Sequence, residues 1–167
     1  MEKYFKKINI SNFISEYDEF EAICKANELI TSGQYSKNLP TYQTLSNLFQ
    51  YKEFSKFLEP LLLSIPNLPE QYLVKMWCYV DFFDNWKLKD REDSWHIHSE
   101  YEKNISAIYY LYVPEVDNEF SGTEFENNYF IKPEKYTWFT YPSNLRHRPG
   151  IITTNEIRCV LAADIYL

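Results

Sequence analysis

The sequence predicts a mostly β fold, an antiparallel sandwich or barrel, with helices in its N-terminal part. Two observations predict it. Residues 72–167 contain many short stretches typical of strands, with no helical pattern between them. Aromatic residues, which pack well on a pleated sheet, make up 19% of the chain. At 167 residues the chain fits one domain, with 1–70 as a helical support region and 72–167 as the β core.

Two helices are predicted in residues 1–70. Ser15 can cap a helix that runs from Glu16 to about Thr31, with Gly33 just past its end. The apolar residues of this helix roughly follow helical spacing: Phe20, Ile23, Cys24, Leu29 and Ile30. Ser46 can cap a second helix with an apolar face formed by Leu48, Phe49, Phe54, Phe57 and Leu58. Three prolines then end the helical pattern: Pro60, Pro66 and Pro69.

The first strand of the β region has a clear period of two. Its apolar positions are Val74, Met76, Cys78, Val80 and Phe82, and the residues between them are Lys75, Trp77, Tyr79 and Asp81. Further strands are predicted at 95–100, 105–113, 128–132, 136–142 and 157–166.

Composition excludes several kinds of partner. A net charge of −7 argues against a nucleic-acid partner, because phosphate binding needs clustered lysines and arginines. No apolar run is long enough for a membrane helix, and the N-terminus shows no signal peptide. Three widely spaced cysteines, Cys24, Cys78 and Cys159, are typical of reduced, buried residues in a cytoplasmic protein. The oligomeric state cannot be deduced from the sequence.

All three histidines fall in the β-rich half. On an extended strand His96, His98 and Glu100 would share one face, since residues two apart point the same way. Such a polar face is unsuited to a core, because each buried polar group needs its own partner. Two histidines and a carboxylate with open positions suit Fe(II) oxygen chemistry. His147, on a later segment, can supply a ligand from a neighbouring strand.

The region from about Leu73 to Leu167 resembles the Fe(II)- and 2-oxoglutarate-dependent oxygenases, above all the prolyl-4-hydroxylase-like and small phage or bacterial branches. The matching segments, in chain order, are Met76-Trp77, His98-Ser99-Glu100, Ile108-Tyr109-Tyr110-Leu111, Val113-Pro114-Glu115, Ser121 to Phe125, Tyr141 to His147, and Arg158. Arg158 lies eleven residues beyond His147, where the family places an arginine. The resemblance implies a double-stranded β-helix, a jelly roll like that of cupins.

The resemblance also implies roles for individual residues. His98, Glu100 and His147 would bind iron, and Arg158 would pair with the far carboxylate of 2-oxoglutarate, assisted by the Tyr110 hydroxyl. The family's usual aspartate is replaced by Glu100, and some relatives carry a His-x-His pair here. His96 and Glu100 therefore both stay open as the second ligand near His98.

The implied activity is that of a dioxygenase that uses Fe(II), 2-oxoglutarate and O2, hydroxylates a peptide or small molecule, and releases succinate and CO2. We expect a dry pocket around the metal. The strands nearest the ligands offer four aromatic residues that either form the wall of this pocket or pack in the core: Trp95, Tyr109, Trp138 and Phe139.

Two other interpretations compete with this one. A cupin-type metal protein would use His96, His98, Glu102 and His147, but it has no need of Arg158 and would carry glycines that are missing here. A β-sandwich interaction module without metal would leave the grouping of all three histidines within these motifs unexplained.

Overall fold

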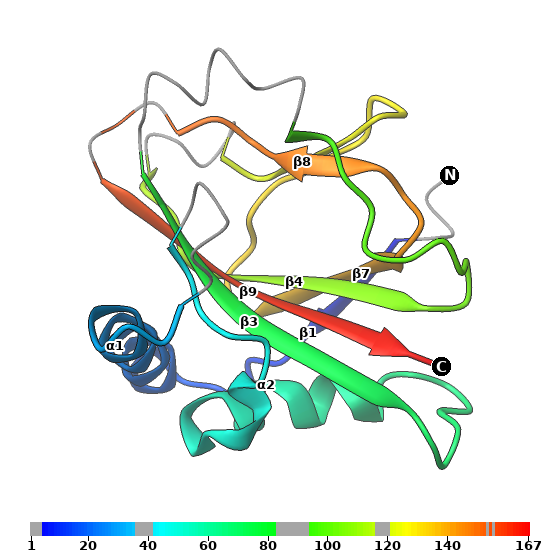
Figure 1. Cartoon of the computed structure of the whole chain (residues 1–167), viewed down its shortest axis with the longest axis horizontal. Helices are drawn as coiled ribbons and strands as arrows, with labels where there is room; N and C mark the ends of the chain where they lie inside the picture. The colour runs from blue at the N-terminus through cyan, green and yellow to red at the C-terminus, as the bar shows by residue number, and fades with distance from the viewer. Residues whose placement is uncertain (1–4, 36–41, 83–93, 116–120, 153, 155) are drawn as a thin grey trace.

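The computed structural model describes residues 5–35, 42–82, 94–115, 121–152, 154 and 156–167. Within these residues two α-helices precede most of the β-structure (Figure 1). In chain order the elements are β1 Lys6–Asn9, α1 Glu16–Thr31, β2 Tyr42–Gln43, the short 3-10 helix Leu48–Gln50, α2 Lys52–Leu63, β3 Leu73–Phe82, β4 Ile105–Tyr112, β5 Thr123–Phe125, β6 Phe130–Ile131, β7 Thr137–Pro142, β8 His147–Pro149 and β9 Ile157–Tyr166. The predicted mostly β fold with N-terminal helices is confirmed.

The strands form two antiparallel sheets. The larger has the order β1-β7-β4-β9-β3-β2, and the smaller has the order β6-β5-β8. Helices α1 and α2 lie on one side of the large sheet, and β8 lies on the other side (Figure 1). A cluster of buried side chains between the sheets includes Ile108, Phe125 and Val160. This arrangement is the jelly-roll core that the sequence predicts.

Helix α1 has the predicted bounds but presents a different face. Ser15 caps it in a capping box with Asp18, and Gly33 follows it with a φ of 85°, in the left-handed region. The buried residues are Glu19, Ala22, Ala26 and Leu29, whereas Phe20 and Cys24 are exposed. The predicted apolar face was therefore wrong for Phe20 and Cys24, whereas Leu29 lies in the core as predicted, next to the small Ala22 and Ala26.

One buried polar pair joins α1 to the large sheet. The Tyr109 hydroxyl donates a hydrogen bond of 2.6 Å to Glu19 Oε1. Burial raises the pKa of Glu19 above its usual value, and the bond from Tyr109 only partly opposes this. The folded state thus favours the protonated carboxyl more than the unfolded state does.

This pair predicts a pH-dependent stability. Glu19 contributes most to the free energy of unfolding below about pH 4.5, where its carboxyl is protonated in both states. This contribution is lost as the pH rises through the raised pKa of Glu19 in the folded protein. We expect Glu19→Gln, which stays neutral and still accepts from Tyr109, to gain stability over the wild type as the pH rises from 5 to 8, by about 1.4 kcal/mol for each unit of pKa shift. Thermal unfolding at several pH values measures this gain. A difference between the two proteins that does not change with pH would contradict it.

The second helix differs from the predicted one. Residues after Ser46 form the 3-10 helix, and α2 begins only at Lys52, with Tyr51 as its N-cap residue. Pro60 lies inside α2 instead of ending it. Its ring removes one backbone hydrogen bond, but it is buried, as are its neighbours Phe57 and Leu61, so packing of the helix continues through it.

The period of two in β3 is confirmed and assigns its two faces. Met76 and Cys78 pack in the core beneath the helices, whereas Trp77 and Tyr79 face the space between the sheets. Strands β4 and β7 place Tyr109 and Trp138 on the helix side, where the Trp138 indole donates to the Phe57 carbonyl oxygen at 3.0 Å. Of the two roles left open by the sequence, these two aromatics therefore pack in the core.

The N-terminal region supplies strands as well as helices, contrary to the prediction of a purely helical support. Strands β1 and β2 come from the supposedly helical region and complete the edges of the large sheet. Cys78 and Cys159 are buried free thiols, but Cys24 is exposed. None of the helices among the described residues is long and apolar enough to cross a membrane.

Candidate metal centre

Three histidines from two segments meet between the sheets. His147 begins β8, and its backbone exchanges two hydrogen bonds of 3.0 Å with that of His96, so the segment around His96 continues the small sheet. The chain then bends at His98, whose N–H donates to the carbonyl oxygen of Ser143, just before β8. Pairing of the two segments therefore brings together imidazoles that are about fifty residues apart.

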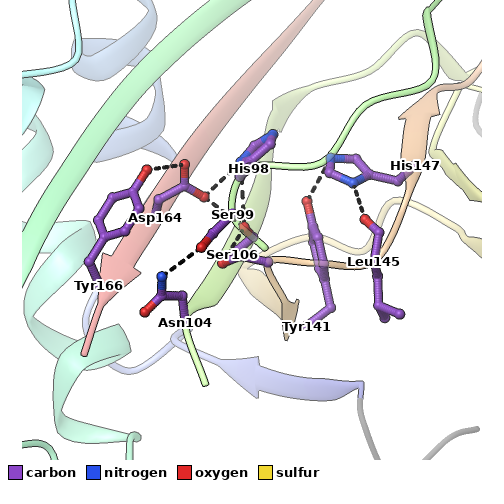
Figure 2. Close-up of polar contacts among 10 residues, drawn as sticks. His98, Ser99, Asn104, Ser106, Tyr141, Leu145, His147, Asp164 and Tyr166 are labelled. Atoms are coloured by element: carbon purple, nitrogen blue, oxygen red, sulfur yellow. Dashed lines mark hydrogen bonds and ion pairs between the residues drawn. The ribbon is translucent and has the colours of Figure 1, made fainter. Parts of the chain in front are cut away.

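The three imidazoles present the same nitrogen to the site. Each Nδ1 lies within hydrogen-bond distance of an oxygen: Ser94 O at 2.9 Å from His96, Asp164 Oδ1 at 2.7 Å from His98, and Leu145 O at 2.8 Å from His147. Carbonyl and carboxylate oxygens only accept, so each Nδ1 carries a proton, and in the neutral form of each ring Nε2 keeps its lone pair. Figure 2 shows these bonds for His98 and His147. A histidine that binds a metal through Nε2 needs this tautomer, in which Nδ1–H donates to a neighbouring oxygen.

Electrostatics favours the neutral imidazole. Burial, reinforced by His96 and His98, lowers the pKa of His147 to about 3. Desolvation and the neighbouring His98 also lower the pKa of His96, although part of its side chain is exposed. A metal ion therefore does not have to displace a proton from His147 near neutral pH.

The spacing fits a metal ion. The ligand atoms of His96, His98 and His147 all lie within 4.8 Å of one another, and the ring centroids are 4.5 to 5.2 Å apart. Metal–nitrogen bonds are about 2.1 Å long, so binding of one ion would draw the rings closer together. Three imidazoles would be able to hold an ion that also binds a cosubstrate. In this structure Tyr141 Oη lies 3.1 Å from Nε2 of His147.

The two glutamates considered from the sequence lie elsewhere. Glu100 is exposed, after a second bend in the chain, and does not belong to the histidine group. Glu102 is also exposed and borders a different, smaller cavity with Asn104 and Pro142. Among the described residues, the carboxylate of Asp164 contacts this group, because its Oδ1 accepts a hydrogen bond from Nδ1 of His98.

A cavity of about 630 Å³ adjoins the histidines. Its walls are mostly apolar, and its lining includes Trp77, Tyr79, Ile108, Tyr141, Pro149 and Ala162. The exposed residues Ser46 and Lys75 mark its open side. A space of this size, with a few convergent polar groups, is typical of small-molecule sites.

Arg158 and Tyr110, the predicted cosubstrate residues, lie directly behind the lining residues of this cavity. The Arg158 side chain is fully buried, with its Cζ 6.0 Å from the centre of the Tyr79 ring. Its Nη1 donates to the carbonyl oxygens of Ser121, Gly122 and Gly150. The Tyr110 hydroxyl is 2.8 Å from Thr123 Oγ1. Tyr79 and Thr123 line the cavity and connect it to the two predicted residues.

Sequence reasoning missed four residues of the site: Tyr79, Thr123, Tyr141 and Asp164. Tyr79 and Tyr141 carried a usable signal, since the first lies on the polar side of a period-two strand and the second is in the segment that ends at His147. Asp164 is the charged residue within the apolar run 159–165, and a buried charge needs a partner. That partner, His98, is 66 residues away, so only the fold identifies it.

No protein-family model matches the sequence, and no curated protein matches it. Solved structures do. A viral collagen prolyl hydroxylase from Paramecium bursaria Chlorella virus-1 is 16% identical, with a TM-score of 0.66 over 98% of this chain and 89% of that one. HygX from Streptomyces hygroscopicus, solved with nickel and 2-oxoglutarate bound, is 12% identical, with a TM-score of 0.62 over 98% and 82%.

A third match comes from a different reaction type. The epimerase SnoN, solved with Fe3+, α-ketoglutarate and nogalamycin RO, is 10% identical, with a TM-score of 0.71 over 98% of this chain and 78% of that one. These likenesses show that the chain has the fold of the 2-oxoglutarate- and Fe(II)-dependent oxygenases, as the sequence predicts. Since the same fold serves a hydroxylase and an epimerase, the reaction must be argued from the site.

Proposed function

We propose that this protein is an Fe(II)- and 2-oxoglutarate-dependent oxygenase whose metal ligands are His96, His98 and His147. The observation that carries the proposal is the shared hydrogen bonding: each Nδ1 lies within hydrogen-bond distance of an oxygen, so each Nε2 can serve as a ligand atom. The Tyr141 hydroxyl, 3.1 Å from His147 Nε2, would yield that position to an ion. The sequence left His96 and Glu100 as two candidates for the second ligand near His98, and Glu100 is exposed and does not belong to the histidine group. The geometry therefore supports His96 as the ligand that precedes His98.

The buried group around Arg158 supports 2-oxoglutarate as the cosubstrate. A dicarboxylate in this cavity needs a cation for its far end, and Arg158 lies behind Tyr79 at the cavity wall. Tyr79 and Thr123 line the cavity, and the Tyr110 hydroxyl lies 2.8 Å from Thr123 Oγ1, so these side chains could add hydrogen bonds. The near carboxylate and keto oxygen of 2-oxoglutarate would then face the three histidines.

The residues of the chain would position and shield the reaction. Bound iron with 2-oxoglutarate supplies O2 activation coupled to the oxidation of 2-oxoglutarate to succinate and CO2. The three histidines would hold the ion at the wall of the cavity, so that a cosubstrate reaches it from the cavity side. Trp77, Ile108 and Ala162 provide apolar wall that limits water.

The proposed substrate is a peptide or small molecule that enters past Ser46 and Lys75, with hydroxylation as the reaction. Both classes of substrate have precedent among the structural neighbours, since one is a collagen prolyl hydroxylase and another was solved with nogalamycin RO. The cavity is large enough for a single residue or a small metabolite.

Succinate formation tests the proposed activity. Under air, protein loaded with Fe(II) is expected to convert 2-oxoglutarate to succinate slowly even without the primary substrate. Omission of iron or replacement of His147 should stop it. Iron-loaded wild-type protein that forms no succinate above the level of the His147 variant would contradict the assignment.

A further inference from the structure

Asp164 is a buried carboxylate in the middle of the large sheet. It lies on β9, where its neighbours in register are Lys75 on β3 and Ser106 on β4. The residue is only 4% exposed. Its side chain points from the sheet toward His98 (Figure 2).

Three side chains direct hydrogen-bonding groups at this carboxylate. His98 Nδ1 and Ser106 Oγ each lie 2.7 Å from Oδ1, and Tyr166 Oη lies 3.4 Å from Oδ2. Ser106 is in turn 3.0 Å from Ser143 Oγ. An ionised carboxylate only accepts, so the Ser106 hydroxyl donates to Asp164.

The same logic decides the state of His98. Ser106 Oγ is also 3.4 Å from Nδ1, but its proton is used on Asp164, so the acceptor for His98 Nδ1–H is Oδ1. The Nε2 lone pair then points to the side where His96 and His147 lie. Without Asp164, Ser106 could donate to Nδ1 and favour the opposite tautomer, with the proton on Nε2.

We propose that Asp164 is a positioning residue that holds His98 in the orientation of a metal ligand. Its carboxylate would act through its hydrogen bond to His98 Nδ1 and would not bind the ion itself. The inference rests on the proposed metal site. Imidazoles carry no negative charge of their own, so the buried carboxylate would supply it through His98. A ligand backed by a carboxylate is a stronger base and holds one orientation.

The tautomer of His98 tests the proposal without metal. Long-range 1H–15N NMR of histidine-labelled, metal-free protein distinguishes a proton on Nδ1 from one on Nε2. We expect Asp164→Ala to change the His98 pattern and leave that of His147, held by the Leu145 carbonyl, as it is. Tyr166→Phe is the matched control, because it removes another donor to Asp164 without contacting His98, and it should keep the wild-type pattern.

Metal affinity provides the second readout. In anaerobic titrations with Fe(II) alone, Asp164→Ala is expected to bind about 10- to 100-fold more weakly, while Tyr166→Phe stays near the wild type. Asp164→Asn keeps the shape of the side chain and serves if the alanine variant does not fold. It should also bind more weakly, because the charge is gone.

The outcomes separate this inference from the proposed function. An alanine variant with the wild-type His98 tautomer, or with wild-type Fe(II) affinity, overturns the role of Asp164. A wild-type protein that binds no Fe(II) contradicts the proposed function. In that case the NMR pattern of the metal-free variant still decides whether Asp164 orients His98.

Discussion

Replacement of His147 by alanine is expected to abolish high-affinity Fe(II) binding. His147 is one of the three proposed ligands, it is buried, and its low pKa keeps it neutral. Loss of a residue that only orients a ligand typically weakens metal binding 10- to 100-fold, so loss of the ligand itself should cost about 100-fold or more. Anaerobic Fe(II) titration of the folded variant, with thermal unfolding to verify the fold, measures the effect.

Glu100→Ala is the matched control for this experiment. Because Glu100 is exposed and outside the histidine group, its loss should leave Fe(II) affinity unchanged, whereas His96→Ala should lower it. Full iron binding by the His147 variant would refute its role. Loss of iron binding in the Glu100 variant would show that Glu100, and not His96, is the ligand.

Replacement of Arg158 by methionine is expected to weaken 2-oxoglutarate binding while iron still binds. The substitution keeps an unbranched buried chain but removes the cation behind Tyr79. Hydrogen bonds to a charged group contribute about 1.5 to 3 kcal/mol, which corresponds to about a 10- to 150-fold loss of affinity. Titration of 2-oxoglutarate into Fe(II)-loaded protein measures it.

A second role of Arg158 requires a second variant. Its guanidinium also binds the carbonyl oxygens of Ser121, Gly122 and Gly150, so Arg158→Met should lower thermal stability as well. Tyr79→Phe leaves these bonds in place and removes only a hydroxyl at the cavity wall, and we expect a smaller loss of 2-oxoglutarate affinity. Unchanged affinity in the arginine variant would show that the cosubstrate binds elsewhere.

Much of the fold could be predicted because long elements repeat their signal. Helix α1 begins at Ser15 and ends before Gly33 as predicted, and β3 and β9 match their predicted spans closely. Elements of two or three residues, such as β2, β5 and β8, carry too few positions to show a period. They form because neighbouring strands pair with them, which the sequence does not display.

The direction of a side chain was harder to predict than its strand. Tyr109 and Tyr110 are neighbours in one strand, yet Tyr109 packs against α2 and Tyr110 lies between the sheets. Both positions are apolar in character, so alternation alone does not say which face meets the helices. Only the packing of Phe57 from α2 against Tyr109 settles it.

At the proposed metal centre the three histidines could be predicted from the sequence, but the carboxylate of Asp164 could not. The rule that residues two apart share a face requires a regular strand, and the chain bends at both His98 and Glu100. The bend turns Glu100 to solvent and leaves His98 against Asp164, from a strand far along the chain. The carboxylate of the centre therefore depends on tertiary structure.

An anaerobic absorption spectrum tests directly whether 2-oxoglutarate binds to iron held by the three histidines. Fe(II)-loaded protein to which 2-oxoglutarate is added should develop a weak visible band from chelation of the cosubstrate by the metal. That band should be absent from His147→Ala and should require higher 2-oxoglutarate concentrations in Arg158→Met. If wild-type protein binds Fe(II) but shows no band at saturating 2-oxoglutarate, then 2-oxoglutarate is not the cosubstrate of this site.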